Sequence, residues 1–263
     1  MNSTNKTAFI PLYGKSYVSK HNIILDDKKA EEIWQKEAFP LKGKAKSRWL
    51  AFYMGMRASV IDDLMNKILA ESNNTVVIHL GCGLDSRCLR IYDAYDKWYD
   101  IDMEPVIDIR KNYYNQTEKY EMVSADVTDM EWIGYTDTAL NAVVVMEGIS
   151  MYLPQESIYE IFSALGEKYP TVHIIMDAYT NKAVRLSKLS NPIDTVDASA
   201  ITGIDDPDIL NTPNGVHYCK KLSITPEEKI NELRGFDKLF FRYMFAGKFA
   251  DSLYRLYYFC NQD

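Results

Sequence analysis

Residues 76–87 (VVIHLGCGLDSR) decide the fold, because an apolar run passes there directly into a glycine turn. A run such as VVI is typical of a strand that is buried on both faces of a parallel sheet. Gly81 and Gly83 lack a Cβ, so each can adopt a positive φ and let the backbone approach a ligand closely. Ligands of doubly wound sheets bind beyond the carboxyl ends of the strands. The stretch therefore predicts a buried strand that ends in a nucleotide-binding loop.

The same loop departs from the dinucleotide fingerprint G-x-G-x-x-G. Ser86 stands at the position of the third glycine. A nicotinamide or flavin cofactor places its pyrophosphate against a bare helix N-terminus, which that glycine helps to provide. A nicotinamide-dependent dehydrogenase is therefore the weaker alternative.

Short apolar runs recur after this loop, separated by segments with helical periodicity. We expect strands over residues 75–80, 97–101, 121–124, 141–146, 171–177, 237–244 and 253–260. Helical patterns lie between several of them, at 106–114, 155–168 and 226–233. Strands that alternate with helices predict an α/β fold with a doubly wound, mostly parallel, seven-stranded sheet of the Rossmann-like type. The last two strands suit an antiparallel edge of that sheet.

We expect a single domain over residues 1–263, since one core suits a chain of this length. Its parts are an N-terminal helical cap (1–70), a Rossmann-like core (71–180 and 226–263) and a lid insertion (181–225). In the cap, one helix is predicted to begin after Asp26 or Asp27 and to end before Pro40. A second helix is predicted over 45–69. The insertion is polar and irregular, and such long segments are usually functional or disordered, so we place it over the substrate.

The charge of the chain argues against nucleic acid as a partner. The formal net charge is −7 and the pI is near 5.2, and an acidic surface repels phosphate backbones. No stretch approaches the roughly 20 apolar residues that span a bilayer, and the first residues lack the features of a signal peptide. We expect a cytoplasmic protein with neither a membrane nor a nucleic-acid partner, while the sequence does not indicate the oligomeric state.

The cysteines are scattered along the chain, at Cys82, Cys88, Cys219 and Cys260. They form no C-x-x-C pair, and the four histidines do not cluster with them in the sequence. We therefore expect neither a zinc site nor a disulfide, and no metal cofactor. Free buried cysteines of this kind are typical of a reducing cytosol.

Acidic residues follow the ends of the next two predicted strands. Asp102 lies 19 residues after Gly83, where an acid at the end of the second strand can bind both hydroxyls of a ribose. Asp100 shares the same face of that strand and is the competing candidate. Asp126 could accept a hydrogen bond from an adenine amino group while Val127 packs against the ring. Taken singly, Asp102 could also be a capping or surface residue, and Asp126 could equally be a turn residue.

Glu147 ends the apolar run AVVVM. A carboxylate at the end of a buried strand is unfavourable unless it meets a ligand or a hydrogen-bond donor. We therefore assign Glu147 to the site. These glycines and acids follow successive strands in a fixed order, and that order indicates a shared binding site more strongly than any single motif.

Four segments, LGCGLDSR, YDIDMEPVIDIR, SADVTD and VVVMEGISMYLP, resemble successive motifs of the leucine carboxyl methyltransferase family, which includes polyketide O-methyltransferases. The resemblance covers residues 45–263. It is most specific in residues 81–87 and in Glu147 and Gly148 followed by Tyr152 and Leu153. It implies a class I methyltransferase fold with S-adenosylmethionine as the methyl donor.

The resemblance also implies roles for individual residues. Gly81 and Gly83 would lie against the cofactor, Asp102 would bind its ribose, Asp126 and Val127 its adenine, and Glu147 would face the amino end of its methionine part. Arg57 lies in a segment similar to the arginine helix of the family and would bind the methionine carboxylate, since a guanidinium can bond both oxygens. Arg48 is the weaker candidate for that role. Two departures are Ser86, where threonine is commoner, and His79, where most class I methyltransferases have an acid and we expect a neutral buried histidine.

The expected reaction is an in-line methyl transfer that needs no metal and no covalent enzyme intermediate. An acceptor carboxylate is already ionised, whereas a hydroxyl acceptor benefits from a general base. Tyr152 is the candidate for the acceptor pocket, and His217 of the predicted lid is a further candidate, although a surface histidine is the commoner outcome. The favoured function is a small-molecule O-methyltransferase with a polyketide-like acceptor. The alternatives are a protein C-terminal carboxyl methyltransferase and a non-catalytic nucleotide-binding module.

Overall fold

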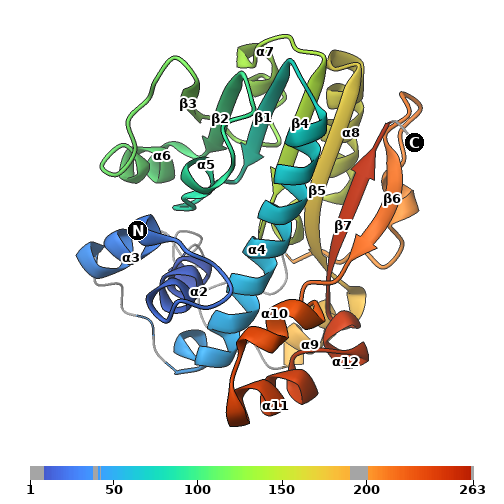
Figure 1. Cartoon of the computed structure of the whole chain (residues 1–263). Helices are drawn as coiled ribbons and strands as arrows, with labels where there is room; N and C mark the ends of the chain where they lie inside the picture. The colour runs from blue at the N-terminus through green and yellow to red at the C-terminus, as the bar shows by residue number, and fades with distance from the viewer. Residues whose placement is uncertain (1–8, 38–40, 42, 190–200, 262–263) are drawn as a thin grey trace.

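Seven strands form one sheet in the computed structural model, which describes residues 9–37, 41, 43–189 and 201–261. Their order is β3-β2-β1-β4-β5-β7-β6 (Figure 1). The strands are β1 Thr75–Leu80, β2 Lys97–Asp102, β3 Tyr120–Ser124, β4 Asn141–Met146, β5 Thr171–Tyr179, β6 His217–Leu222 and β7 Tyr254–Cys260. The first five are parallel, and β7 runs antiparallel to both β5 and β6. The predicted mostly parallel, seven-stranded sheet with an antiparallel edge is confirmed.

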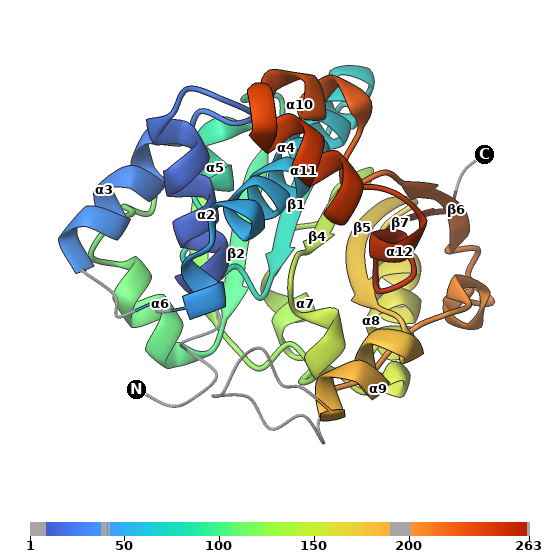
Figure 2. The ribbon, with the colours of Figure 1, turned by 90° about the horizontal axis from the view of Figure 1, so that it is seen from below.

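Helices cover both faces of the sheet, so that it is the middle of three layers (Figures 1 and 2). They are α2 Phe9–Lys20, α3 Lys28–Glu37, α4 Arg48–Glu71, α5 Arg87–Arg90, α6 Glu104–Arg110, α7 Trp132–Tyr135, α8 Gln155–Lys168, α9 Asn181–Leu189, α10 Glu227–Glu232, α11 Gly235–Met244 and α12 Lys248–Asp251. Val77 and Val143 pack on one face with Met65 of α4. Val76 packs on the other face with Phe162 of α8. This two-sided burial explains the unbroken apolar runs of the central strands.

Helix α3 lies within its predicted limits, and α4 begins and ends two or three residues later than the predicted helix over 45–69. Helix α3 begins after Asp27, whose carboxylate accepts a hydrogen bond of 2.8 Å from the backbone nitrogen of Ala30. Ser47 caps α4 in the same way, accepting from the backbone nitrogen of Leu50 at 3.2 Å. Such caps satisfy backbone donors that lack an intrahelical partner. Within the predicted cap, no separate helix was predicted before Asp26, and the structure has α2 there, Phe9–Lys20.

Helix α2 packs directly against α4 through two glycines. A Cβ at Gly14 would lie 2.6 Å from the Cβ of Met54, and a Cβ at Gly55 would lie 2.7 Å from a methyl of Val18. Only glycine permits such an approach. The close packing brings the neighbouring Lys15 into the interior, where it is 2% exposed.

The predicted strand over 237–244 is wrong, because these residues lie in the helix α11. Short apolar runs do not distinguish a strand from a buried helix by periodicity alone. The aromatic residues of α11 pack against α4 of the cap, where the ring centroids of Phe240 and Trp49 are 4.4 Å apart. Phe241 is fully buried beside them.

The missing strand lies instead within the predicted lid insertion. Strand β6 (HYCKKL) pairs with β7 at the edge of the sheet. Tyr218 packs toward the sheet, with its ring centroid 5.9 Å from that of Tyr257, whereas Lys220 and Lys221 are exposed. Lysines are common on edge strands because they discourage pairing with another chain, and here they concealed the strand. The rest of the expected lid comprises α9 and a 3-10 helix, Pro207–Leu210, while 190–200 fall outside the described residues.

The expectation that all cysteines are free is also wrong. Cys219 of β6 and Cys260 of β7 are joined by a disulfide, with their Cα atoms 6.2 Å apart. They are separated by 41 residues, so only the pairing of the two strands reveals their proximity. Cys82 and Cys88 are free and buried, as predicted.

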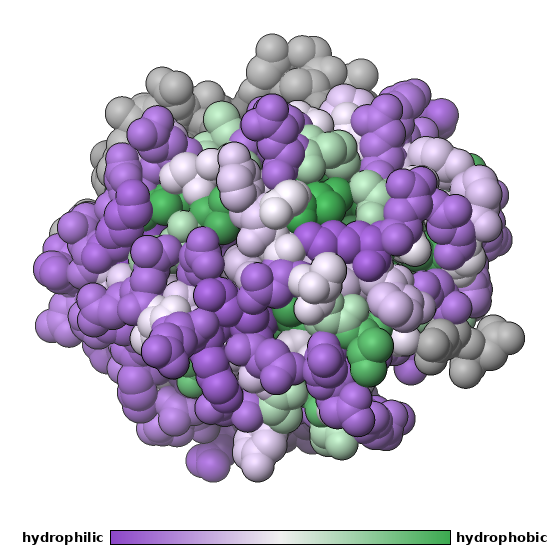
Figure 3. Space-filling model, turned by 90° about the horizontal axis from the view of Figure 1, so that it is seen from above, coloured by the Kyte–Doolittle hydropathy of each residue, from purple (hydrophilic) through white to green (hydrophobic). Residues whose placement is uncertain are grey.

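The face at the amino ends of the strands is mostly hydrophilic, and its apolar side chains form small separate groups (Figure 3). Among the described residues, no helix is both long and apolar enough to cross a membrane. The opposite face, at the carboxyl ends of the strands, collects α2, α4 and the loops that follow the strands (Figure 2). The glycine loop after β1, Asp102 and Glu147 lie on this second side.

Candidate functional site

The loop after β1 has the backbone that its two glycines predict. Gly81 and Gly83 have φ values of +66° and +54°, a region that favours glycine. A Cβ at Gly81 would lie 2.4 Å from the Cδ1 of Ile149, which follows β4. The nitrogen of Gly81 donates a hydrogen bond of 2.8 Å to the carbonyl of Ile101 in β2. The loop is thus held between the ends of β2 and β4.

Asp102 lies at the carboxyl end of β2 beside this loop. Its two oxygens accept hydrogen bonds from the backbone nitrogens of Gly83 at 2.7 Å and Met103 at 2.8 Å. Burial raises the pKa of Asp102, and these two donors oppose the rise. These bonds fix the carboxylate at the carboxyl end of β2, where the sequence predicts an acid that binds the ribose.

Asp100, the competing candidate, is buried and bonded to side chains of the protein itself. It is fully buried and accepts hydrogen bonds from Arg110, from the Tyr120 hydroxyl at 2.6 Å and from Trp98 Nε1 at 2.9 Å. His79 is also buried, with Nδ1 3.4 Å from Asp100. These contacts tie β1, β2 and β3 together, so Asp100 supports the sheet beneath the loop.

Arg57 and Glu147 meet at the centre of the candidate site. Arg57 projects from α4, is 2% exposed and donates from Nη2 to Glu147 Oε1 at 2.7 Å. Its Nη1 lies 2.9 Å from Asp177 Oδ2 and 2.5 Å from the hydroxyl of Tyr254. Burial disfavours ionisation of Glu147, but Arg57, Arg87 and further cationic neighbours outweigh it and hold the pKa of that carboxyl well below its usual range. Glu147 is therefore a buried, ionised carboxylate.

Two partners of Arg57 were missed by the sequence. Asp177 lies near the end of β5 and accepts from the backbone nitrogen of Gly148 at 2.8 Å and from the hydroxyl of Tyr254 at 2.5 Å. Burial raises the pKa of Asp177, and Arg57 opposes the rise. The apolar run of β5 predicted the strand that ends in Asp177, but no pattern linked Tyr254 to it.

A second set of charges supports Glu147 from the side of the glycine loop. Arg87 donates to Glu147 and, from Nε, to Asp62 at 2.6 Å. Lys15 of α2 lies 3.0 Å from Asp85 and 4.0 Å from Glu147. Asp85 and Arg87 belong to the loop motif LGCGLDSR, but neither of them was assigned to the site from the sequence. Lys15 carried no signal, because its place depends on the packing of α2 against α4.

The remaining candidates lie in different surroundings. Asp126 is exposed and accepts from the backbone nitrogen of Thr128 at 2.9 Å, while Val127 is buried. Tyr152 is half-buried in the 3-10 helix Ser150–Tyr152 after β4.

Two candidates are not brought into the site. His217 lies on the edge strand β6, paired with Cys260, and Cys260 pairs with His173 near the amino end of β5. His217 is therefore not in a lid over the carboxyl ends of the strands. Arg48 forms a partly exposed ion pair of 2.9 Å with Asp237 and takes no part in the charge cluster around Glu147.

The cluster has the groups needed by an amino acid moiety with an amino and a carboxylate end. Arg57 Nε is buried and has no hydrogen-bond partner among the described residues, although such donors are normally satisfied. A carboxylate is the natural partner for an arginine, and Glu147 is an acceptor suited to an ammonium group. The methionine part of S-adenosylmethionine carries both groups, and the residues present fit it.

Comparison with known proteins agrees with this geometry. The sequence model of the leucine carboxyl methyltransferase family matches residues 7–166, more than half of the chain. A curated relative, the tetracenomycin polyketide synthesis O-methyltransferase TcmP of Streptomyces glaucescens, is 29% identical over 218 residues, 82% of this chain and 80% of its own. The S-adenosyl-L-methionine-dependent methyltransferase dpfgK of Gibberella zeae is 25% identical over 135 residues, 48% of this chain and 45% of its own.

Solved structures show the same fold at low sequence identity. The magnesium protoporphyrin IX methyltransferase ChlM of Synechocystis, with bound SAH, aligns with a TM-score of 0.52 and 10% identity over 94% of this chain and 98% of its own. The N-methyltransferase NodS of Bradyrhizobium japonicum, in complex with S-adenosyl-L-homocysteine, aligns with a TM-score of 0.51 and 11% identity over 95% and 100%. With the family match, they establish a class I methyltransferase fold. The chain belongs to the leucine carboxyl methyltransferase family and is an S-adenosylmethionine-dependent methyltransferase.

Proposed function

We propose that the chain is an O-methyltransferase that methylates a hydroxyl or carboxylate oxygen of a small, polyketide-like molecule. The observation that carries the proposal is the buried cluster of Arg57, Glu147 and Asp177 beside a group of tyrosines at the carboxyl ends of the strands. The cluster suits the amino acid end of the methyl donor. The tyrosines suit an apolar acceptor with polar oxygens, and the relative TcmP is described as a polyketide O-methyltransferase.

The cofactor-binding residues follow from this arrangement. We assign Gly81, Gly83, Asp102, Asp126, Val127, Glu147 and Arg57 to the cofactor. Arg57 would bind the carboxylate of the methionine part and Glu147 its ammonium group. Asp102 would accept hydrogen bonds from the ribose hydroxyls, while Asp126 would bind the adenine amino group and Val127 would pack against the ring.

Tyrosines form the proposed acceptor side. The rings of Tyr179 and Tyr254 are 5.1 Å apart between centroids, and those of Tyr53 and Tyr254 are 6.2 Å apart. Tyr53 and Tyr254 also line a cavity of about 250 Å³ together with Ile224. Tyr152 acts on Tyr179 electrostatically and would complete this wall.

These tyrosines are suited to donate hydrogen bonds and unsuited to act as bases. Burial raises the pKa of Tyr179 to about 12 and that of Tyr53 further. Both hydroxyls therefore stay protonated at neutral pH. We infer that the acceptor oxygen is ionised in solution before it binds, as a carboxylate or an acidic phenol is.

S-adenosylmethionine supplies an electrophilic methyl group on a sulfonium when it is bound. The chain's own residues then contribute position and a dry environment. The fixed charges around Glu147 would hold the donor, and the tyrosine wall would orient the acceptor oxygen in line with the methyl group. Such alignment can lower a barrier by about 7–11 kcal/mol.

A second candidate is a protein C-terminal carboxyl methyltransferase, which the description of the matching family favours. It differs from the first only in the acceptor, since a peptide carboxylate also needs no base. The two are therefore distinguished by the acceptor that is methylated.

The test has two stages. Thermal shift with S-adenosylmethionine, S-adenosylhomocysteine and NAD should show stabilisation by the first two alone, by about 2.7 kcal/mol at a ligand concentration of 100 Kd. Radiolabelled methyl transfer is then measured to acidic phenols, to aromatic carboxylic acids and to peptides ending in a leucine carboxylate. Label in the small molecules supports the proposal, and label only in the peptides establishes the second candidate. Without stabilisation by either cofactor form, the assignment of the site is wrong.

A further inference from the structure

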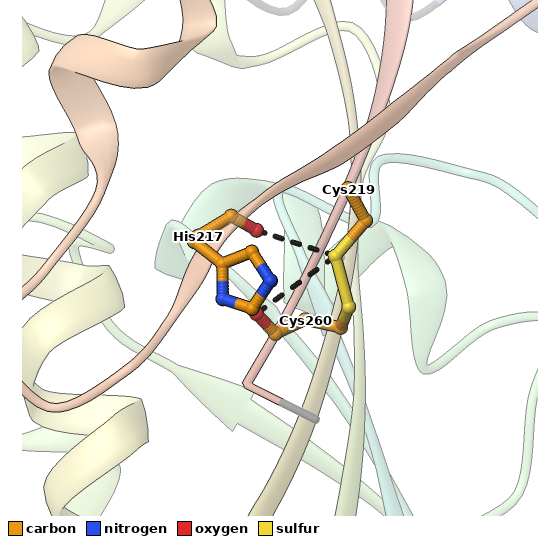
Figure 4. Close-up of side chains that lie close together, drawn as sticks. All are labelled: His217, Cys219 and Cys260. Carbon is orange, nitrogen blue, oxygen red and sulfur yellow. Dashed lines mark hydrogen bonds between the residues drawn. A yellow bond between two sulfur atoms is a disulfide. The ribbon is translucent and has the colours of Figure 1, made fainter. Parts of the chain in front are cut away.

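A cluster of possible metal ligands lies far from the candidate active site, on the antiparallel edge of the sheet. One ligand atom from each of His217, Cys219 and Cys260 lies within 4.8 Å of the other two. Figure 4 shows the imidazole beside the two sulfur atoms, which here form a disulfide. The three residues come from two strands, β6 and β7, that are paired directly.

The pairing of the strands creates this cluster. His217 is the register partner of Cys260, and partners in an antiparallel pair project from the same face of the sheet. The register shifts between Tyr218 and Lys220, so Cys219 occupies a bulge. A bulge redirects side chains, and here it brings the sulfur of Cys219 to the sulfur of Cys260.

The imidazole of His217 is oriented as in many metal sites. Its Nδ1 lies 2.7 Å from the carbonyl oxygen of Gly215. A carbonyl can only accept, so Nδ1 is the donor in this contact, and a cation would bind through Nε2. Histidines that bind metals usually donate their other nitrogen to a carbonyl or carboxylate in this way. The same contact fixes the side on which Nε2 is presented.

We propose that the reduced form of this cluster binds one thiophilic divalent cation, zinc being the first candidate, through His217 Nε2 and the thiolates of Cys219 and Cys260. Zinc binds thiolate sulfur at about 2.3 Å and imidazole nitrogen at about 2.0–2.1 Å. A tetrahedral site therefore separates neighbouring ligand atoms by roughly 3.8 Å or less. The Cα atoms of Cys219 and Cys260 are 6.2 Å apart, and binding of the cation requires the side chains of the reduced cysteines to rotate until their sulfur atoms reach this spacing. His217 and Cys219 are half-buried, so water can take the fourth position.

The disulfide and the cation exclude each other. Reduction of the disulfide takes two electrons and two protons from a dithiol, which becomes a disulfide itself. The cation then binds the two sulfurs as thiolates, and two protons are released. Binding is therefore possible only in the reduced protein. An oxidising disulfide that takes two electrons from the thiolates, and becomes a dithiol, restores the disulfide of the chain and expels the cation.

The site is structural or regulatory in position. Cys260 ends β7, whereas Tyr254 begins it at the active-site end. Six strand residues span about 20 Å at 3.3 Å per residue. A cation here would join β6 to β7 without touching the donor or the acceptor.

The test titrates the reduced, metal-free whole chain with cobalt(II), a coloured probe for zinc sites, and then displaces it with zinc. One equivalent should give a thiolate charge-transfer band and the visible bands of tetrahedral cobalt. Losing a residue that hydrogen-bonds to a metal ligand typically weakens metal binding by roughly 10- to 100-fold. Cys219→Ser removes a ligand itself and should weaken cobalt binding by more than that. His217→Gln should keep the charge-transfer band and alter the tetrahedral bands. His21→Gln, at an exposed histidine outside the cluster, is the matched control and should bind as the unaltered chain does.

The oxidised, unaltered chain provides a comparison that needs no substitution. Its disulfide should abolish the charge-transfer band, and reduction with a dithiol should restore it. Circular dichroism of both forms checks that the fold persists. Absence of tight binding to the reduced chain overturns the proposal, as does a band that survives in Cys219→Ser with full intensity. The latter outcome would place the cation at Cys82 and Cys88, the two free cysteines.

Discussion

Glu147 lies among three cationic side chains. Arg57 and Arg87 both donate to its carboxylate, and Lys15 lies 4.0 Å away. Removing one member of a buried ion pair typically destabilises a protein by about 3–5 kcal/mol, because the partner remains charged. The same carboxylate is proposed to bind the ammonium group of the cofactor. A single substitution therefore affects both stability and binding.

We expect Glu147→Gln to lower the free energy of unfolding by about 3 kcal/mol or more and to weaken binding of S-adenosylhomocysteine. Urea denaturation and calorimetry measure the two effects. Glu118→Gln, at an exposed position, is the control and should change stability by less than about 0.5 kcal/mol. Unchanged affinity in folded Glu147→Gln would remove the residue from the cofactor site.

Substitutions at the two aspartates of β2 should have different effects, one on cofactor binding and the other on stability. Asp102→Ala should weaken S-adenosylhomocysteine binding by about 10- to 100-fold, the equivalent of one charged hydrogen bond of about 1.5–3 kcal/mol. Asp100→Ala should instead lower stability by about 3–5 kcal/mol, because Arg110 would lose its buried partner. Calorimetry on both variants, with unfolding curves, tests the assignment. If Asp100→Ala weakened binding while Asp102→Ala did not, the roles of the two acids would be reversed.

At the level of elements, the contact between α2 and α4 determines whether Lys15 reaches the site. We expect Gly14→Ala to push α2 away from Met54 and to lower stability by about 1–3 kcal/mol, as overpacking generally does. Gly134→Ala is the matched control, since a Cβ there meets nothing within 4 Å. Thermal unfolding compares the two. Equal stability of both variants would show that the α2–α4 contact is loose.

The elements that the sequence predicted correctly are those whose local pattern and final burial agree. Strands β1 and β4 read as unbroken apolar runs and are buried along almost their whole length. Helix α8 was predicted with its observed limits, because its apolar residues recur at helical spacing. The polar edge strand β6 and the aromatic helix α11 were not found, since their environment comes from partners distant in the sequence.

The residues of the candidate site were predicted where they follow a strand that the sequence also predicts. Asp102 and Glu147 follow strands that the apolar runs predict, and Arg57 was identified through a family resemblance. Asp177 and Tyr254 were not predicted, because they contact Arg57 together only when β5 and β7 lie side by side. The disulfide of Cys219 and Cys260 escaped for the same reason.

For the whole molecule, the buried carboxyl groups predict how stability depends on pH. Burial disfavours ionisation of Asp85 as of Glu147, yet their cationic neighbours hold the pKa of each well below its usual range. A lowered pKa means that the folded state binds fewer protons, so this stabilisation is complete above a pH of about 4 and is lost below it. Burial raises the pKa of Asp102 and Asp177, so the folded state takes up their protons first and gains stability as the pH falls toward 4.

We therefore expect a maximum of stability at mildly acidic pH, followed by a steep loss below a pH of about 4. Each proton that the unfolded state binds and the folded state does not changes the free energy of unfolding by about 1.4 kcal/mol per pH unit. Glu147 and Asp85 together should give about twice that slope. Urea unfolding between pH 3 and pH 8 measures the profile. Glu147→Gln removes one titrating group, so its slope below pH 4 should be shallower by about one proton. Parallel profiles for the two proteins would contradict an ionised Glu147, and with it the balance of charges on which the proposed cofactor site depends.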